Sequence, residues 1–121
     1  MKVAEELWAD GVVCITVEGR LDAATVPTLE QALQRLLTEG QGRLVMNLSG
    51  VNYISSSGLR VLLTARRQAR SRGGDMFLCH LHPRVREIFE MVGFLSVFGI
   101  YAECEQAASA FSQSASVAPP L

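Results

Sequence analysis

A short run of three apolar residues most constrains the fold of this chain. Leu44, Val45 and Met46 follow one another inside a predicted strand over residues 43–48. Successive side chains of a strand point to opposite faces, so a continuous apolar run is typical of a central strand that is covered on both sides. A predicted helix that continues to about residue 72 follows this strand, and a strand–helix–strand order makes neighbouring strands run parallel. We therefore expect an α/β fold.

The remainder of the chain alternates between strand and helix patterns in the same way. An Asp-Gly pair at residues 10–11 predicts a turn between two short strands, and such a turn makes an antiparallel hairpin. Thr25 is the expected N-cap of the first helix. The resulting order, β-β-α-β-α-β-α-β-α, predicts a mixed, mostly parallel sheet of about five strands with four helices. The predicted strands cover about residues 2–8, 12–18, 43–48, 76–81 and 97–101, and the predicted helices about residues 25–39, 55–72, 82–92 and 103–111.

The length and composition suit one globular domain. A chain of 121 residues with 49% hydrophobic content is long enough to bury a genuine core. We expect the domain to cover residues 1–112 and the Ser-, Ala- and Pro-rich residues 113–121 to form a flexible tail.

A net charge of −1 disfavours binding to nucleic acid. No apolar run approaches the roughly 20 residues of a spanning helix, and no signal-peptide pattern opens the chain. We therefore expect the protein to be cytoplasmic and not to be inserted in a membrane.

The cysteines predict neither a disulfide nor a metal site. Cys14, Cys79 and Cys104 are odd in number, far apart and without C-x-x-C spacing. In a reducing cytoplasm they are expected to be small buried apolar groups. The segment 79–82, Cys-His-Leu-His, gathers only three potential ligands, too few for a closed tetrahedral site, so no metal ion and no cofactor are expected.

Three consecutive serines stand where the predicted central strand gives way to a helix. Ser55, Ser56 and Ser57 precede Gly58 and Leu59. A serine just before an apolar helical stripe is a natural N-cap, and either Ser55 or Ser56 fits that role. A glycine at the next position allows a tight turn or the close approach of another surface. By themselves, these residues predict a capped helix.

The serine junction resembles the signature of STAS domains. More narrowly, the chain is similar to bacterial anti-sigma factor antagonists, which are small standalone STAS proteins of partner-switching systems. Many members carry Asp where this chain has Ser55. The matching segments occur in family order over nearly the whole chain: residues 19–22 with Pro27, 47–51, 53–54, 56–63, 83–94 and 97–98.

The resemblance implies a binding protein and not an enzyme. Such antagonists bind a serine kinase of the histidine-kinase-like ATPase type, which otherwise restrains a sigma factor. Phosphorylation of a junction serine breaks that complex, and a PP2C-type phosphatase restores it. By position the phosphorylated residue is Ser56, with Ser55 and Ser57 as rival acceptors. The implied partner surface comprises Asp22, Ser55, Ser56, Ser57, Gly58, Leu59 and Arg60.

Other interpretations of the same residues stay open. The chain could be a constitutive STAS scaffold or a subunit of a membrane-associated transport complex, with purely structural serines. It could instead bind a nucleotide at the helix N-terminus, although no Gly-rich loop with Lys supports that. Asp22 could be a turn residue that binds its own backbone.

Two further surfaces could contact partners. The second helix carries five arginines without an intervening acidic residue, which predicts a solvated face or a patch for an acidic partner. They are Arg60, Arg66, Arg67, Arg70 and Arg72. Phe94, Val97 and Phe98 could supply an exposed apolar edge, and we expect a monomer or weak dimer.

Overall fold

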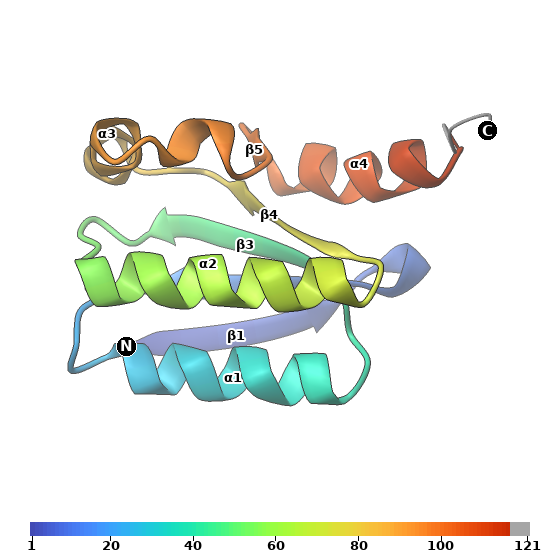
Figure 1. Ribbon diagram of the computed structural model, residues 1–121, viewed down its shortest axis with the longest axis horizontal. Helices are drawn as coiled ribbons and strands as arrows, with labels where there is room; N and C mark the ends of the chain where they lie inside the picture. Colours follow the sequence, from blue (N-terminus) through green and yellow to red (C-terminus); the bar gives the residue numbers. More distant parts are fainter. Residues whose placement is uncertain (117–121) are drawn as a thin grey trace.

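The structure is a computed structural model that describes residues 1–116, and within them one five-stranded sheet forms the centre of the fold. The strands lie in the order β1-β2-β3-β4-β5 (Figure 1). β1 runs antiparallel to β2, and every other neighbouring pair is parallel. The predicted mixed, mostly parallel sheet is therefore confirmed. The strands are β1 (Lys2–Leu7), β2 (Val12–Glu18), β3 (Arg43–Gly50), β4 (Asp75–Cys79) and β5 (Ile100–Tyr101).

Four α-helices cover the sheet within the described residues. They are α1 (Val26–Thr38), α2 (Ser56–Ser71), α3 (Pro83–Met91) and α4 (Cys104–Ser116). α1 and α2 lie side by side along one face of the sheet in Figure 1 and contact each other. The Gln34 side chain of α1 donates to Gln68 of α2 at 2.6 Å, which joins the two helices at a polar position.

The central run of β3 is covered on both faces, as its sequence predicts. Leu44 and Met46 belong to the larger core cluster, which contains the apolar stripes of α1 and α2 together with Val85 and Phe89 of α3. Val45 points to the other face, where a smaller cluster packs beneath α4. All three residues of the run are fully buried. Burying a side chain of this size contributes roughly 1.5–3 kcal/mol, so this strand anchors both layers.

The last third of the chain departs from the prediction. Residues 94–96 form a short 3-10 helix, and β5 has only two residues where a strand over 97–101 was expected. The predicted apolar edge is also wrong, because Phe98 is buried and packs with Phe89 and Phe94. The apolar residues that α3 does expose are Met91 and, just after it, Val92.

The final helix is longer than its sequence pattern predicts. α4 continues to Ser116, five residues past the expected end at Phe111. Residues 117–121 of the predicted tail lie outside the described part of the chain, and the domain boundary at residue 112 stays a prediction.

Among the residues the structure describes, no helix combines the length and apolar character needed to cross a bilayer.

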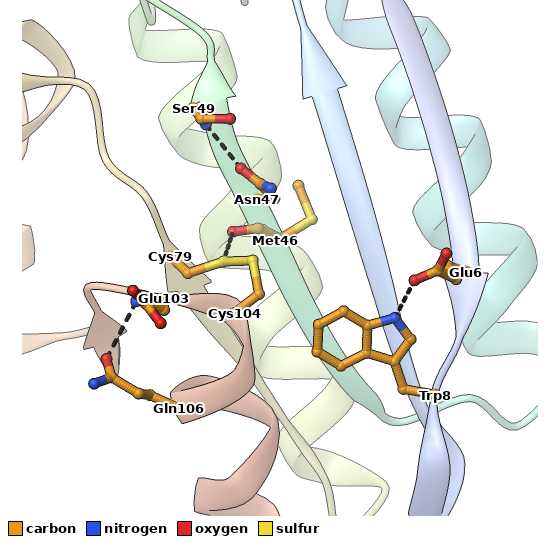
Figure 2. Close-up of a disulfide and its surroundings, with 9 residues drawn as sticks. All are labelled: Glu6, Trp8, Met46, Asn47, Ser49, Cys79, Glu103, Cys104 and Gln106. Atoms are coloured by element: carbon orange, nitrogen blue, oxygen red, sulfur yellow. Dashed lines mark hydrogen bonds between the residues drawn. A yellow bond between two sulfur atoms is a disulfide. The ribbon is translucent and has the colours of Figure 1, made fainter.

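The prediction that all three cysteines are unpaired is wrong. Cys79, the last residue of β4, forms a disulfide with Cys104, the first residue of α4 (Figure 2). Their Cα atoms lie 5.3 Å apart, within the usual range for a disulfide. Only Cys14 remains a free and buried thiol in the described chain. The sequence separation of 25 residues gave no local signal, because α3 and β5 intervene before the chain returns.

Candidate functional site

The three serines of the junction have different environments. Ser55 is the N-cap of α2, with extended backbone, and its Oγ accepts a hydrogen bond from the Gly58 N–H at 3.3 Å. The Ser55 and Ser57 hydroxyls are hydrogen-bonded to each other at 2.9 Å, and both side chains are half-buried. Ser56, the first residue of the helix, is exposed. Of the two predicted caps, Ser55 is therefore the one used.

The Ser56 hydroxyl belongs to an exposed residue. It makes no side-chain hydrogen bond within residues 1–116. It stands at the N-terminus of a 16-residue helix, where the first backbone N–H groups lack intrahelical partners and the helix dipole is positive. No acidic residue occupies this first turn. The position is therefore accessible, electrostatically suited to negative charge and not already occupied by a carboxylate.

Gly58 allows the junction to pack against the loop that precedes α1. A Cβ atom at Gly58 would lie 2.8 Å from Cγ1 of Ile54 and 2.9 Å from Cγ of Leu21, far inside normal contact. Leu59 is also buried in the main core. Of the predicted partner-surface residues, these two therefore lie inside the protein and hold the junction in place.

Two loops far apart in sequence are joined at this site. The Leu21 N–H donates to the Tyr53 carbonyl at 3.0 Å, and the Ser55 N–H donates to the Leu21 carbonyl at 2.8 Å. These bonds belong to an isolated parallel bridge between Leu21 and Ile54. Asp22, the next residue, consequently lies beside the serine junction, as the resemblance implied.

The Asp22 carboxylate organises its own loop. Its Oδ1 accepts from the backbone N–H groups of Ala24 at 3.0 Å and Thr25 at 3.2 Å, and Oδ2 lies 3.5 Å from Nε of Arg20. Partial desolvation acts to raise the pKa of Asp22, but the hydrogen bonds from Thr25, Ala24 and Arg20 together hold that pKa below its ordinary value. Asp22 is thus an ionised turn residue, and its contact with a partner stays a prediction.

Thr25 occupies the N-cap position of α1, as predicted, but it does not cap the helix through its side chain. Its side chain makes no capping bond to the helix. The hydroxyl instead accepts from the Asp22 N–H at 2.9 Å and donates to the Arg20 carbonyl at 2.6 Å. The hydroxyl therefore closes the loop that carries Asp22.

A polar and aromatic rim surrounds the junction. The Arg20 guanidinium lies 4.2 Å from the centre of the Tyr53 ring, a distance at which a cation attracts the ring face. Arg60 is exposed one turn after Ser56. A neighbouring cavity of about 520 Å³ lies between the loops and α3 and includes Arg84 in its lining. Arg84 was not predicted as part of this site, because α3 is distant in sequence and no local motif marks it.

The predicted arginine patch is divided. Arg66 and Arg70 both form ion pairs with Asp75, at 3.5 and 3.1 Å. Arg72 donates to the carbonyl of Leu37. Arg60 and Arg67 remain on the exposed surface of α2. The run is therefore partly structural, and of its five arginines Arg60 stands nearest the junction in sequence, one turn into α2.

Comparison with known proteins identifies the family. The family model described as STAS domain matches residues 8–107, which is most of the chain. This chain belongs to the STAS domain family. A curated relative from Bordetella bronchiseptica, BtrV, provisionally named an anti-sigma factor antagonist, is 41% identical over 102 residues, covering 84% of this chain and 88% of that protein. The STAS domain described here therefore falls among the anti-sigma factor antagonists.

Solved structures agree with this placement. The crystal structure of an anti-sigma factor antagonist from Mycobacterium paratuberculosis superposes with a TM-score of 0.81 and 27% identity, covering 92% of this chain and 93% of that one. The Bacillus cell fate determinant SpoIIAA, in its phosphorylated form, has the same fold, with a TM-score of 0.70, 21% identity and coverage of 90% and 98%. The predicted STAS fold is confirmed.

Proposed function

We propose that this STAS domain is a phosphorylation-switched antagonist in a partner-switching system. When unmodified it binds a serine kinase of the histidine-kinase-like ATPase type that acts as an anti-sigma factor. Phosphorylation of Ser56 by that kinase releases it, and a PP2C-type phosphatase returns it to the binding form. Such a cycle uses ATP and places the protein in the cytoplasm as a regulatory partner and not an enzyme.

The observation that carries the proposal is the difference among the three serines. Ser55 and Ser57 bond to each other, and Ser55 also caps the helix, so modifying either would break existing contacts. Ser56 is exposed and makes no side-chain hydrogen bond within residues 1–116. A kinase therefore reaches Ser56 without disturbing α2, which supports it over its two rivals as the acceptor.

The fold has a place for the phosphate that this reaction would add. A phosphoserine carries about −1.5 to −2 charges at neutral pH. At the first position of α2 that charge faces unpaired N–H groups and the positive end of the helix dipole. Arg60 follows four residues later, a spacing that puts both side chains on one helix face. We therefore expect the domain to remain folded when Ser56 is modified.

The Ser-for-Asp difference at Ser55 is compatible with this function. Asp and Ser are about equally good N-caps, so the change keeps the capping role that Ser55 fills. What the chain loses is one carboxylate beside the acceptor. The kinase must then orient Ser56 through other groups, and Asp22 and Arg20 on the adjoining loop are charged candidates.

The release step follows from desolvation. A partner surface that covers Ser56 in the complex would bury any phosphate placed there. An unpaired buried charge costs several kcal/mol at an interface, and about 1.4 kcal/mol corresponds to a tenfold change in affinity. The switch therefore needs no large change in the shape of the STAS domain.

The test is a binding titration with a purified serine kinase of this type from the same organism. Ser56→Ala should bind like the wild type. Ser56→Asp should bind at least about a hundredfold more weakly, because the single negative charge of the aspartate would lose its water when the partner covers it, and burying an unpaired charge is costly. Ser57→Ala is the matched control and should bind normally. Equal binding by all the variants would contradict the switch and would favour a constitutive scaffold or transport-complex subunit.

A further inference from the structure

A second cluster of chemically reactive side chains lies away from the serine junction. It consists of Cys79, His80 and Cys104, whose sulfur and imidazole nitrogen atoms all lie within 4.8 Å of one another. Cys79 is the last residue of β4, and His80 follows it directly. Cys104 is the first residue of α4, and Figure 2 shows the two cysteines. The segment 79–82 alone predicted no metal site, but the fold brings to Cys79 and His80 a second sulfur, that of Cys104, from 25 residues beyond Cys79.

We propose that the reduced protein binds one Zn²⁺ ion through Cys79, His80 and Cys104. Two thiolates and one imidazole form a Cys₂His set, which zinc accepts together with a water molecule in an open fourth position. Thiolates also select zinc over magnesium or calcium, whose preferred ligands are oxygen atoms. The three ligands therefore favour zinc and leave one of its four coordination positions to a water molecule.

The fourth position opens onto a cavity. A volume of about 330 Å³ adjoins the cluster and includes both His80 and Cys104 in its lining. Thr16, Asn47 and Glu105 also line it and supply polar partners for a metal-bound water, which needs two to four of them. Cys14 lines the same cavity but is not one of the three residues whose ligand atoms converge.

The two histidines of segment 79–82 have different roles. Nδ1 of His82 accepts a hydrogen bond from the Arg84 N–H at 3.2 Å, so His82 caps α3. His80 has a left-handed backbone with φ of 55°, which is uncommon for a residue other than glycine. Such strain usually persists where the surrounding structure enforces it for a function, and here it accompanies an imidazole placed beside two sulfur atoms.

The disulfide and the metal site exclude each other. With the two sulfur atoms bonded together, neither is a thiolate, and zinc cannot bind them. A phosphine cleaves the S–S bond by supplying two electrons, takes an oxygen atom from water to become a phosphine oxide, and leaves two thiols. Zinc then displaces the two thiol protons. The Cys79 sulfur lies 3.5 Å from the Met46 carbonyl oxygen, a partner available to the thiol in the metal-free reduced state.

The experiment uses the full chain, treated with a phosphine and freed of metal by a chelator, then titrated anaerobically with Co²⁺. Cobalt reports tetrahedral thiolate coordination through a charge-transfer band in the near ultraviolet and strong visible bands. We expect one equivalent to bind, quenching of the single tryptophan, Trp8, which lines the same cavity, and displacement by Zn²⁺. The oxidised protein should show none of these signals.

Matched variants separate the ligands from their neighbours. Cys79→Ala and Cys104→Ala should abolish the charge-transfer band, whereas Cys14→Ala should retain it. His80→Asn keeps a residue that tolerates the left-handed backbone and should weaken cobalt binding about a hundredfold, since losing even a residue that orients a ligand costs about 10–100-fold. His82→Asn keeps a good helix cap and should bind normally. Circular dichroism of each reduced variant checks that it folds. No charge-transfer band in the reduced wild type, or equal binding by His80→Asn and His82→Asn, would overturn the proposal.

Discussion

The serine junction and the Cys79–Cys104 cluster each lie at the end of a strand of the same mixed sheet, yet they are built in opposite ways. The junction follows β3 and consists of neighbours in sequence, with an exposed hydroxyl on Ser56. The cluster begins at the last residue of β4, takes its second sulfur from α4, and buries both sulfur-bearing residues. The Ser56 hydroxyl is therefore open to contact with another protein, whereas the two sulfur atoms belong to residues that are shielded from such contact.

The two sites also stabilise the fold in different ways. The junction depends on close packing and a helix cap, each involving a few atoms. The cluster ties two elements together covalently. Perturbing the cluster should therefore have the larger effect on folding, and perturbing the junction the larger effect on recognition.

The largest expected effect is that of reducing the disulfide in metal-free buffer. The bond closes a loop between residues 25 apart, and closing a loop of that size destabilises the unfolded chain by about 3.5 kcal/mol. Urea unfolding with and without a phosphine, in the presence of a chelator, measures this loss. Cys79→Ala, which has no bond to reduce, should show no difference between the two conditions. If the wild type unfolds at the same urea concentration with and without the phosphine, the disulfide does not stabilise the fold.

Gly58→Ala should have the next largest effect. The new methyl group would meet Ile54 and Leu21 at less than 3 Å, and overpacking of this kind costs about 1–3 kcal/mol. Gly42→Ala is the control, because a Cβ there would meet only ordinary contacts, the nearest at 3.8 Å. Urea unfolding of both variants makes the comparison. Equal stability of the two would mean that the junction is not held by the close approach to Leu21.

Removing the helix cap should have a smaller effect. Ser55→Ala deletes the acceptor for the Gly58 N–H and should lower the free energy of unfolding by about 1 kcal/mol. Ser55→Asp should restore the cap and leave stability near that of the wild type. Ser56→Ala, whose hydroxyl caps nothing, serves as the reference in the same denaturation series. If Ser55→Ala were as stable as Ser56→Ala, the division of roles between these serines would fail.

The smallest expected effect is a change in acid stability at Asp22. The pKa of this carboxyl is lower in the folded protein than in the unfolded chain. Its contribution is therefore fully present above the ordinary Asp value of about 3.9 and is lost as the pH falls through the folded pKa. In Asp22→Asn, the free energy of unfolding should fall less steeply between about pH 4 and pH 2 than in the wild type. An unchanged slope would show that Asp22 titrates alike in both states.

Much of the fold could be predicted because its signals are local. The apolar run of β3, the Asp-Gly turn and the stripes of α1 and α2 each occupy a few adjacent residues. β5 was overestimated because Val97 and Phe98 have a strand-like composition, while Phe98 is needed in a cluster with Phe89 and Phe94. Tertiary packing decided that segment.

The two sites also differ in how far local sequence could predict them. The serine junction was predicted in place, but which serine caps the helix depends on backbone geometry that composition does not encode. The pairing of Cys79 with Cys104 depends on where α4 begins relative to the end of β4, which is a property of the folded chain. Odd cysteine number and wide spacing therefore misled the prediction.

The most direct test of the switch is a map of phosphate incorporation. The full chain is incubated with ATP and a serine kinase of the histidine-kinase-like ATPase type from the same organism, and the modified residue is located by tandem mass spectrometry. We predict one phosphate per chain on Ser56, absent from Ser56→Ala and retained in Ser57→Ala. Phosphate on Ser55 or Ser57 with Ser56 unmodified, or no incorporation by a kinase that binds the chain, would contradict the account.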